Sequence, residues 1–132
     1  MGGATMKGDQ YIHPAAKRRL DREHLKSVKV AEDSVTSARN CYGKSHPKIA
    51  EALSALGEHY QSCSDFERAE AAFKEALAIR ENIPSDSASI VVALRSLSRL
   101  YNVAGQPEKS RPLVQRANVI EMDDFQTAAP PL

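Results

Sequence analysis

The sequence of 132 residues has no tryptophan, only two cysteines and a formal net charge of only +1. Cys41 and Cys63 are too few and too far apart for a disulfide scaffold or a zinc knuckle, so we expect free thiols in a reducing, cytoplasmic compartment. The small net charge creates no global field that would require a nucleic-acid or membrane partner. No apolar run approaches the roughly 20 residues of a membrane-spanning helix, and no membrane span is expected.

Signatures of catalysis are also missing. The sequence has no glycine-rich phosphate loop, no nucleophile elbow and no paired carboxylates. The four histidines, at positions 13, 24, 46 and 59, lack the spacing of metal ligands, which favours structural roles for them. We therefore expect no catalytic residues, no metal and no cofactor, and we do not expect an enzyme.

A helical pattern fills most of the chain. From Ala15 to Ile120 the apolar residues recur at helical spacing, and no window alternates apolar and polar residues as a strand would. The pattern predicts an all-α protein with a helical domain over residues 15–120, which begins with a long helix over residues 15–42. Residues 1–14 contain three glycines and are expected to form a flexible arm. Residues 121–132 are acidic and end in Pro-Pro-Leu, so we expect them to fray.

The main signal is an internal repeat with a period of 41 residues. Within each repeat the apolar residues are spaced three and four apart, which stacks them on one face of a helix. Each repeat is therefore predicted to be an antiparallel helix pair, over residues 47–82 and 86–120. A shift by the period superimposes Leu53, Leu56 and Tyr60 on Leu94, Leu97 and Tyr101, and Ala69, Phe73 and Ala76 on Ser110, Val114 and Ala117.

The first repeat, with Gly57 and Phe66 added to these positions, resembles the tetratricopeptide repeat family, and the second repeat is more degenerate. The long period and the His46-Pro47 start are similar to the long-repeat, kinesin-light-chain-like subclass. Residues 34–47 look like the end of a preceding repeat. Over residues 28–120 the resemblance implies two and a half helix pairs, stacked as a short right-handed α-solenoid.

In this family the first helices of the pairs line a concave groove, and the non-consensus positions of those helices touch ligands. Arg95 and Arg99 lie four residues apart, so we expect two guanidinium groups that point together and could clamp a carboxylate or phosphate. The alternative is that they form ion pairs with Glu51 or Glu58 across the groove. The resemblance places these positions in the groove: Glu51, Ser54, Ala55, Glu58, Gln61, Ser62, Val92, Arg95, Ser96, Arg99, Asn102 and Val103.

A run of basic residues in the first helix is a second candidate docking site. It could meet phosphates or an acidic protein surface. Asp21 and Glu23 interrupt the run, and the run contains no aromatic residue that could stack on bases, so nucleic acid is not favoured. The alternatives are a solvated face or contact with the acidic first repeat of a neighbouring copy. The residues are Lys17, Arg18, Arg19, Arg22 and Lys26, followed by Lys29.

These observations favour a non-catalytic protein-protein interaction module, an adaptor or scaffold, which binds a peptide or helix of a partner protein in its groove. The alternative is a small structural subunit of a homo-oligomer or larger complex, whose groove and end faces are filled by neighbours. An RNA-contacting helical repeat is a remote alternative. About three repeats are the usual minimum for an array to cover its apolar faces, so association with another chain is expected.

Overall fold

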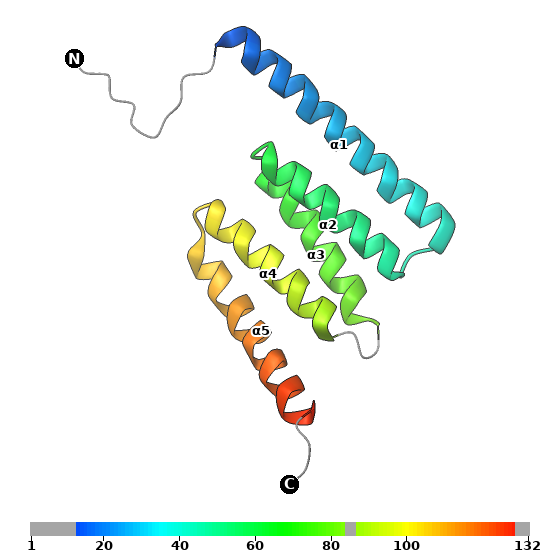
Figure 1. The fold of residues 1–132 in the computed structure, drawn as a ribbon, viewed down its shortest axis with the longest axis vertical. Coiled ribbons are helices and arrows are strands. Elements are labelled where there is room, and N and C mark those ends of the chain that lie inside the picture. The colour runs from blue at the N-terminus through cyan, green and yellow to red at the C-terminus, as the bar shows by residue number, and fades with distance from the viewer. Residues whose placement is uncertain (1–12, 84–86, 129–132) are drawn as a thin grey trace, which may run out of the picture.

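A computed structural model describes residues 13–83 and 87–128 of the chain. These residues form five α-helices and no strand, which confirms the predicted all-α class. Figure 1 shows the helices side by side in chain order, so that each helix packs mainly on its neighbours in the sequence. The helices are α1 (Pro14–Tyr42), α2 (Pro47–Ser62), α3 (Phe66–Glu81), α4 (Ser87–Val103) and α5 (Pro107–Ala128).

The helix starts and turns follow local rules that the sequence already contains. The His46 ring accepts a hydrogen bond from the Lys48 backbone N–H at 3.1 Å, and Pro47 occupies the first turn of α2, where a missing N–H costs nothing. Ser64 and Gly105, one period apart, lie at the α2–α3 and α4–α5 turns with positive φ angles of 62° and 81°. These left-handed residues reverse the chain within each helix pair.

The core consists of buried apolar residues of α2, α3 and α4, to which α1 and α5 add smaller contributions. Ile49, Leu94 and Ala69 are fully buried, and Ala76 of α3 is 1% exposed. Alanine at positions 69 and 76 lets the helix backbones approach closely. The repeated residues that the sequence predicted to face inward therefore form one continuous core.

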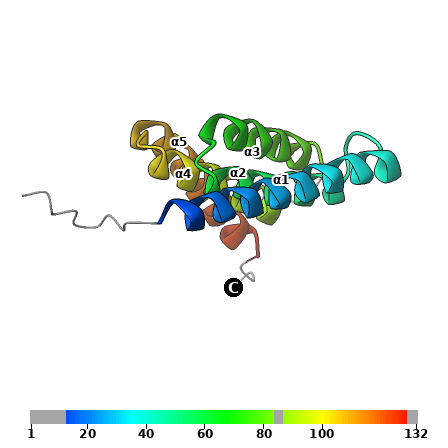
Figure 2. The same ribbon diagram turned by 90° about the horizontal axis from the view of Figure 1, so that it is seen from above.

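Helix α1 occupies the place of the second helix of an incomplete preceding pair. Its buried residues Ala31 and Val35 have the same spacing as Ala69 and Phe73 in α3, and Figure 2 shows α1 as a single straight helix. On this alignment Val28 corresponds to Phe66, the first residue of α3. Residues 14–27 therefore form an extra segment of 14 residues, about 21 Å long, which we call the α1 overhang.

The α1 overhang projects past the end of α2 (Figure 1). Leu20 and Leu25 are 41% and 68% exposed, and Val28 is half-buried. The structural-subunit hypothesis expects this stripe to be covered; within a single chain Val28 packs against the core, whereas Leu20 and Leu25 remain exposed.

The C-terminal boundary differs from the prediction. Helix α5 continues through residues 121–128, a segment that we expected to fray after residue 120. Polar contacts hold this extension: Ser87 Oγ donates a hydrogen bond to Asp124 at 2.7 Å, and Arg95 contacts Glu121. Apolar periodicity could not reveal the extension, because its side chains contact α4 through polar groups. Most of the predicted arm, residues 1–12, lies outside the described residues.

Within the described ranges, no helix combines the length and the apolar character that crossing a membrane would require.

Candidate partner-binding groove

Two rows of side chains, one on α2 and one on α4, define the candidate groove. Neighbouring members of a row are three or four residues apart, so each row follows one face of its helix. A shift by the 41-residue period superimposes the two rows. The α2 row contains two carboxylates, whereas the α4 row contains two valines and one arginine. The α2 row is Glu51, Ala55, Glu58 and Ser62, and the α4 row is Val92, Ser96, Arg99 and Val103.

The structure brings the two rows together at the C-terminal ends of α2 and α4. One shallow hollow is lined by predicted groove residues from both helices. Val92 and Val103 are 59% and 55% exposed, so the α4 row offers apolar surface to a partner. Ser54 and Gln61 are half-buried at the edge of the α2 row. The residues that line the hollow are Glu58, Gln61, Ser62, Arg99 and Val103.

The prediction that Arg95 and Arg99 point together is wrong. Arg95 forms an ion pair with Glu121 and donates a hydrogen bond to Asn118 at 3.3 Å, both on α5. The α5 extension places Glu121 beside residue 95, which the sequence pattern did not show. The alternative, that the two arginines pair with Glu51 or Glu58, is wrong as well, since neither forms such a pair in the described part of the chain.

Asn102 also lies apart from the α2–α4 hollow. It lines a separate hollow with α5 residues that include Ser110 and Gln115. Arg99 is therefore the charged residue among the predicted α4 residues that line the α2–α4 hollow.

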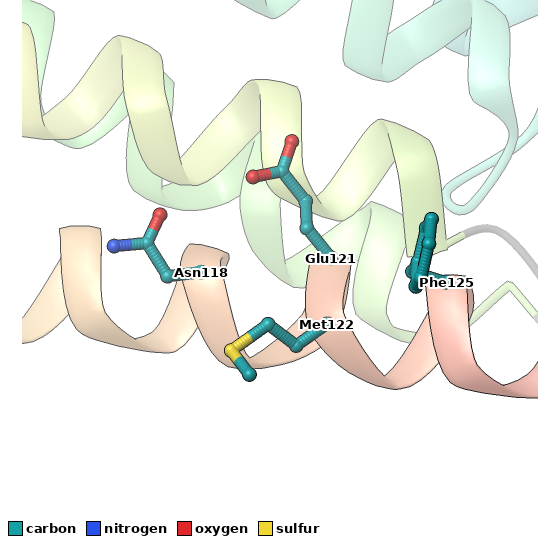
Figure 3. Close-up of a pocket in the computed structure, with 4 residues that line it drawn as sticks. All are labelled: Asn118, Glu121, Met122 and Phe125. Carbon is teal, nitrogen blue, oxygen red and sulfur yellow. The ribbon is translucent and has the colours of Figure 1, made fainter.

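A further hollow lies along the end of α5 and was missed from the sequence. Figure 3 shows Asn118 and Glu121 directed toward α4, whereas Met122 turns away from it. Phe125, which also lines this hollow, is 77% exposed. Little in the sequence pointed to it, because Glu121, Met122 and Phe125 were expected to belong to the frayed tail.

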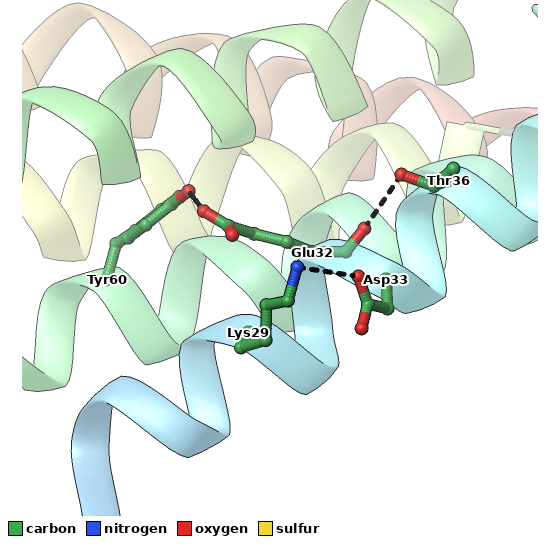
Figure 4. Close-up of polar contacts among 5 residues, drawn as sticks. All are labelled: Lys29, Glu32, Asp33, Thr36 and Tyr60. Carbon is green, nitrogen blue, oxygen red and sulfur yellow. Dashed lines mark hydrogen bonds and ion pairs between the residues drawn. The ribbon is translucent and has the colours of Figure 1, made fainter. Parts of the chain in front are cut away.

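Helices α2 and α4 are each joined to the preceding helix by a hydrogen bond from one tyrosine. The Tyr60 hydroxyl of α2 donates a hydrogen bond to Glu32 of α1, and the Tyr101 hydroxyl of α4 donates one to Glu70 of α3. Figure 4 shows the first contact, beside the ion pair of Lys29 with Asp33 at 3.5 Å and the hydrogen bond from Thr36 to the Glu32 backbone at 3.2 Å. The two contacts fix the positions of α2 and α4, which carry the groove.

The pKa of Tyr60 is raised to about 12, mainly by burial and to a smaller extent by the hydrogen bond to Glu32. Burial also raises the pKa of Tyr101, and the hydrogen bond from Tyr101 lowers the pKa of Glu70. Both tyrosines are therefore neutral donors in the folded protein at neutral pH.

We expect Tyr60→Phe to lower the free energy of unfolding by about 1 kcal/mol at pH 8, because Glu32 loses its donor. Because the pKa of Tyr60 is higher in the folded than in the unfolded protein, the stabilisation by its neutral hydroxyl is complete below pH 10. It is lost as the pH rises from 10 to about 12. Urea unfolding at pH 8 and pH 11 therefore tests the contact. The difference between wild type and variant should shrink at pH 11, and a constant difference would contradict the assignment.

The predicted basic patch lies on the α1 overhang. Lys17 pairs with Asp21 at 3.2 Å. The remaining basic residues of the patch are exposed and form no ion pair with any residue that the structure describes. They are Arg18, Arg19, Arg22 and Lys26.

Two of the four histidines cap helices, and both cysteines are free thiols. His13 and His46 each cap the start of a helix through a ring nitrogen. Cys41 is an exposed free thiol and Cys63 a half-buried one. In residues 13–83 and 87–128 no group of three or more histidine, cysteine or acidic side chains is arranged to hold a metal ion.

Comparison with solved structures finds a similar fold in the crystal structure of BtubC (BKLC) from P. vanneervenii. The TM-score is 0.73 and the sequence identity 24%, over 86% of this chain and 45% of that one. The present chain thus spans less than half the length of that protein. None of the curated proteins matches the chain.

The tetratricopeptide repeat family matches the chain over two overlapping stretches, residues 15–82 and 49–117. Repeats of this family are typical of protein-interaction and scaffold modules. The first stretch includes all but the first residue of α1, in line with the place of that helix as part of a preceding pair. Together the matches confirm the resemblance drawn from the sequence, and the chain belongs to the tetratricopeptide repeat family.

Proposed function

We propose that the protein is a non-catalytic interaction module that binds a helix or peptide of another protein in the groove between α2 and α4. The observation that carries this proposal is the shared hollow, in which Glu58 of α2 and Arg99 of α4 lie with Val103. Glu58 and Arg99 form no ion pair with each other or with any other residue that the structure describes. Their charges are therefore available to a partner. The free thiols support a reducing, cytoplasmic location.

The composition of the two rows suggests which segments would bind. The carboxylates of Glu51 and Glu58 favour basic side chains along the α2 side. Val92 and Val103 favour apolar side chains along the α4 side, and Arg99 favours a carboxylate between them. A protein segment that presents apolar and basic residues on neighbouring faces meets these requirements. Nucleic acid does not, since it would bring phosphates beside both glutamates.

Selection of displayed peptides on the immobilised protein tests this function. We expect the wild type to enrich peptides that combine basic and apolar residues. We expect the variant Glu58→Lys/Arg99→Glu, which keeps the net charge, to lose these peptides, because both charges in the hollow are reversed.

A suitable control is the variant Lys44→Glu, which changes an exposed side chain in the α1–α2 turn and should leave the selection unchanged. Enrichment of the same peptides by wild type and by Glu58→Lys/Arg99→Glu would refute binding in this groove.

A further inference from the structure

We propose that the segment bound in the groove is the α1 overhang of a second copy of this chain. This inference rests on the groove as the binding site and names its occupant. It is based on four features of the molecule: the free charges of the overhang, the complementary charges of the groove, the exposed apolar side chains on both surfaces, and the rigid direction in which the overhang projects.

The α1 overhang has the chemistry that the groove favours. It contains five basic and two acidic side chains, and one of each is used in the Lys17–Asp21 ion pair. Arg18, Arg22 and Lys26 are spaced four apart and follow one exposed face of the helix. Leu25, 68% exposed, lies beside this face. The overhang therefore presents a basic stripe next to an exposed apolar side chain.

The spacing of charges agrees between the two surfaces. Glu51 and Glu58 are seven residues apart on α2, and Arg19 and Lys26 are seven residues apart on the overhang. Glu51 also lies 3.9 Å from Lys48, in an exposed and therefore weak ion pair that an incoming basic side chain can replace. Seven residues span about 10.5 Å along a helix, so two basic side chains of one copy can meet two carboxylates of another at the same time. Glu23, which forms no ion pair among the described residues, provides a carboxylate for Arg99.

The apolar surfaces also correspond. Val92 and Val103 on α4 are exposed, and so are Leu20 and Leu25 on the overhang. Their exposed fractions in the described chain range from 41% for Leu20 to 68% for Leu25. Burial of such residues at a contact between two copies would stabilise the complex through the hydrophobic effect.

The overhang cannot fill the groove of its own chain. The later part of α1 is fixed to α2 by the buried residues Ala31 and Val35 and by the Tyr60–Glu32 hydrogen bond. Because α1 is one straight helix, this attachment directs the overhang beyond the end of α2 (Figures 1 and 2). A second copy can receive the overhang, and reciprocal exchange between two copies would close the assembly as a dimer.

Charge reversal on each surface tests the exchange, with the mass in solution measured by light scattering over a range of concentrations. The wild type should form species heavier than the 14.5 kDa chain. The overhang variant Arg19→Glu/Lys26→Glu and the groove variant Glu51→Lys/Glu58→Lys should each associate at least roughly tenfold more weakly, since each places like charges opposite each other. The control variant Lys44→Glu/Arg111→Glu has the same charge change as the overhang variant and should behave like the wild type.

Mixing provides the decisive result. The overhang variant and the groove variant should associate with each other, because opposite charges then face each other in both contacts. A single chain with all four substitutions should also regain self-association. Circular dichroism of each variant checks that the helices remain folded.

Three results would overturn the inference: a wild-type mass of 14.5 kDa at all concentrations, unchanged association of either reversed variant, or no recovery on mixing. Groove binding of other proteins would survive any of these results. In that case the peptide selection would still depend on Glu58 and Arg99, whereas the overhang variant would select the same peptides as the wild type.

Discussion

Replacement of Gly57 by alanine is expected to lower the free energy of unfolding by about 1 to 3 kcal/mol. A Cβ atom added at Gly57 would lie 2.8 Å from the Phe73 ring, and two further ring atoms would lie 2.9 Å away. Phe73 is only 2% exposed, so its ring has little room to move. In an open helix the same replacement would stabilise the protein by about 1 kcal/mol, so the contact with Phe73 determines the sign.

The second repeat shows how this contact is relieved. Ser98 stands one period after Gly57, and Val114 stands one period after Phe73. Ser98 on α4 is larger than Gly57, and Val114 on α5 is correspondingly smaller than Phe73. The combination of Gly57→Ala with Phe73→Val should therefore cost less than the sum of the two single changes.

A double-mutant cycle measured by urea unfolding tests the coupling, with Ser98→Ala as the matched control in the second repeat. Among the residues that the structure describes, Ser98 donates a hydrogen bond to the Arg95 carbonyl of its own helix at 3.0 Å, so we expect a loss of about 1 kcal/mol or less. Stabilisation by Gly57→Ala would mean that the ring of Phe73 moves aside freely.

Truncation of Leu94 to alanine should have the largest effect of any single change considered, a loss of about 2 to 5 kcal/mol. Leu94 is 0% exposed and belongs to the hydrophobic core, to which α4 contributes it. Removal of its side chain leaves a cavity that neighbouring helices can close only in part. For a chain of this size such a loss is a large share of the total stability.

Leu25→Ala is the matched control, because it removes the same atoms from a side chain that is 68% exposed. We expect it to change the free energy of unfolding by less than about 0.5 kcal/mol. If exchange of the overhang occurs, it should nevertheless weaken self-association. Equal destabilisation by Leu94→Ala and Leu25→Ala would contradict the burial that the structure assigns to the two residues.

Much of the fold was predictable because it depends on local periodicity. Leu53, Leu56 and Tyr60 face inward for the same reason that Leu94, Leu97 and Tyr101 do: each set lies on one stripe of a helix whose other side meets water. His46-Pro47 marks the start of α2, and Gly105 marks the α4–α5 turn. The helix pairs and their order could therefore be derived from spacing and from residues with restricted backbone angles.

The candidate groove was predictable as a set of positions, but the direction of its side chains was not. Arg99 lines the shared hollow together with Glu58. Arg95, one turn earlier, is drawn to Glu121 and Asn118 instead. A long flexible side chain near the edge of a helix face follows the nearest opposite charge, and that charge comes from a different helix.

The sequence alone determined the helical class and the 41-residue repeat, since both follow from the period of the helix, whereas the positions of the two rows on α2 and α4 came from the resemblance to the family. Only the tertiary structure decided where α5 ends, which arginine is free, and that the first 14 residues of α1 extend past α2. These features depend on contacts between residues that are far apart in the chain, such as Ser87 with Asp124 and Tyr60 with Glu32. Local spacing carries no information about such contacts, because the packing of the helices brings the partners together.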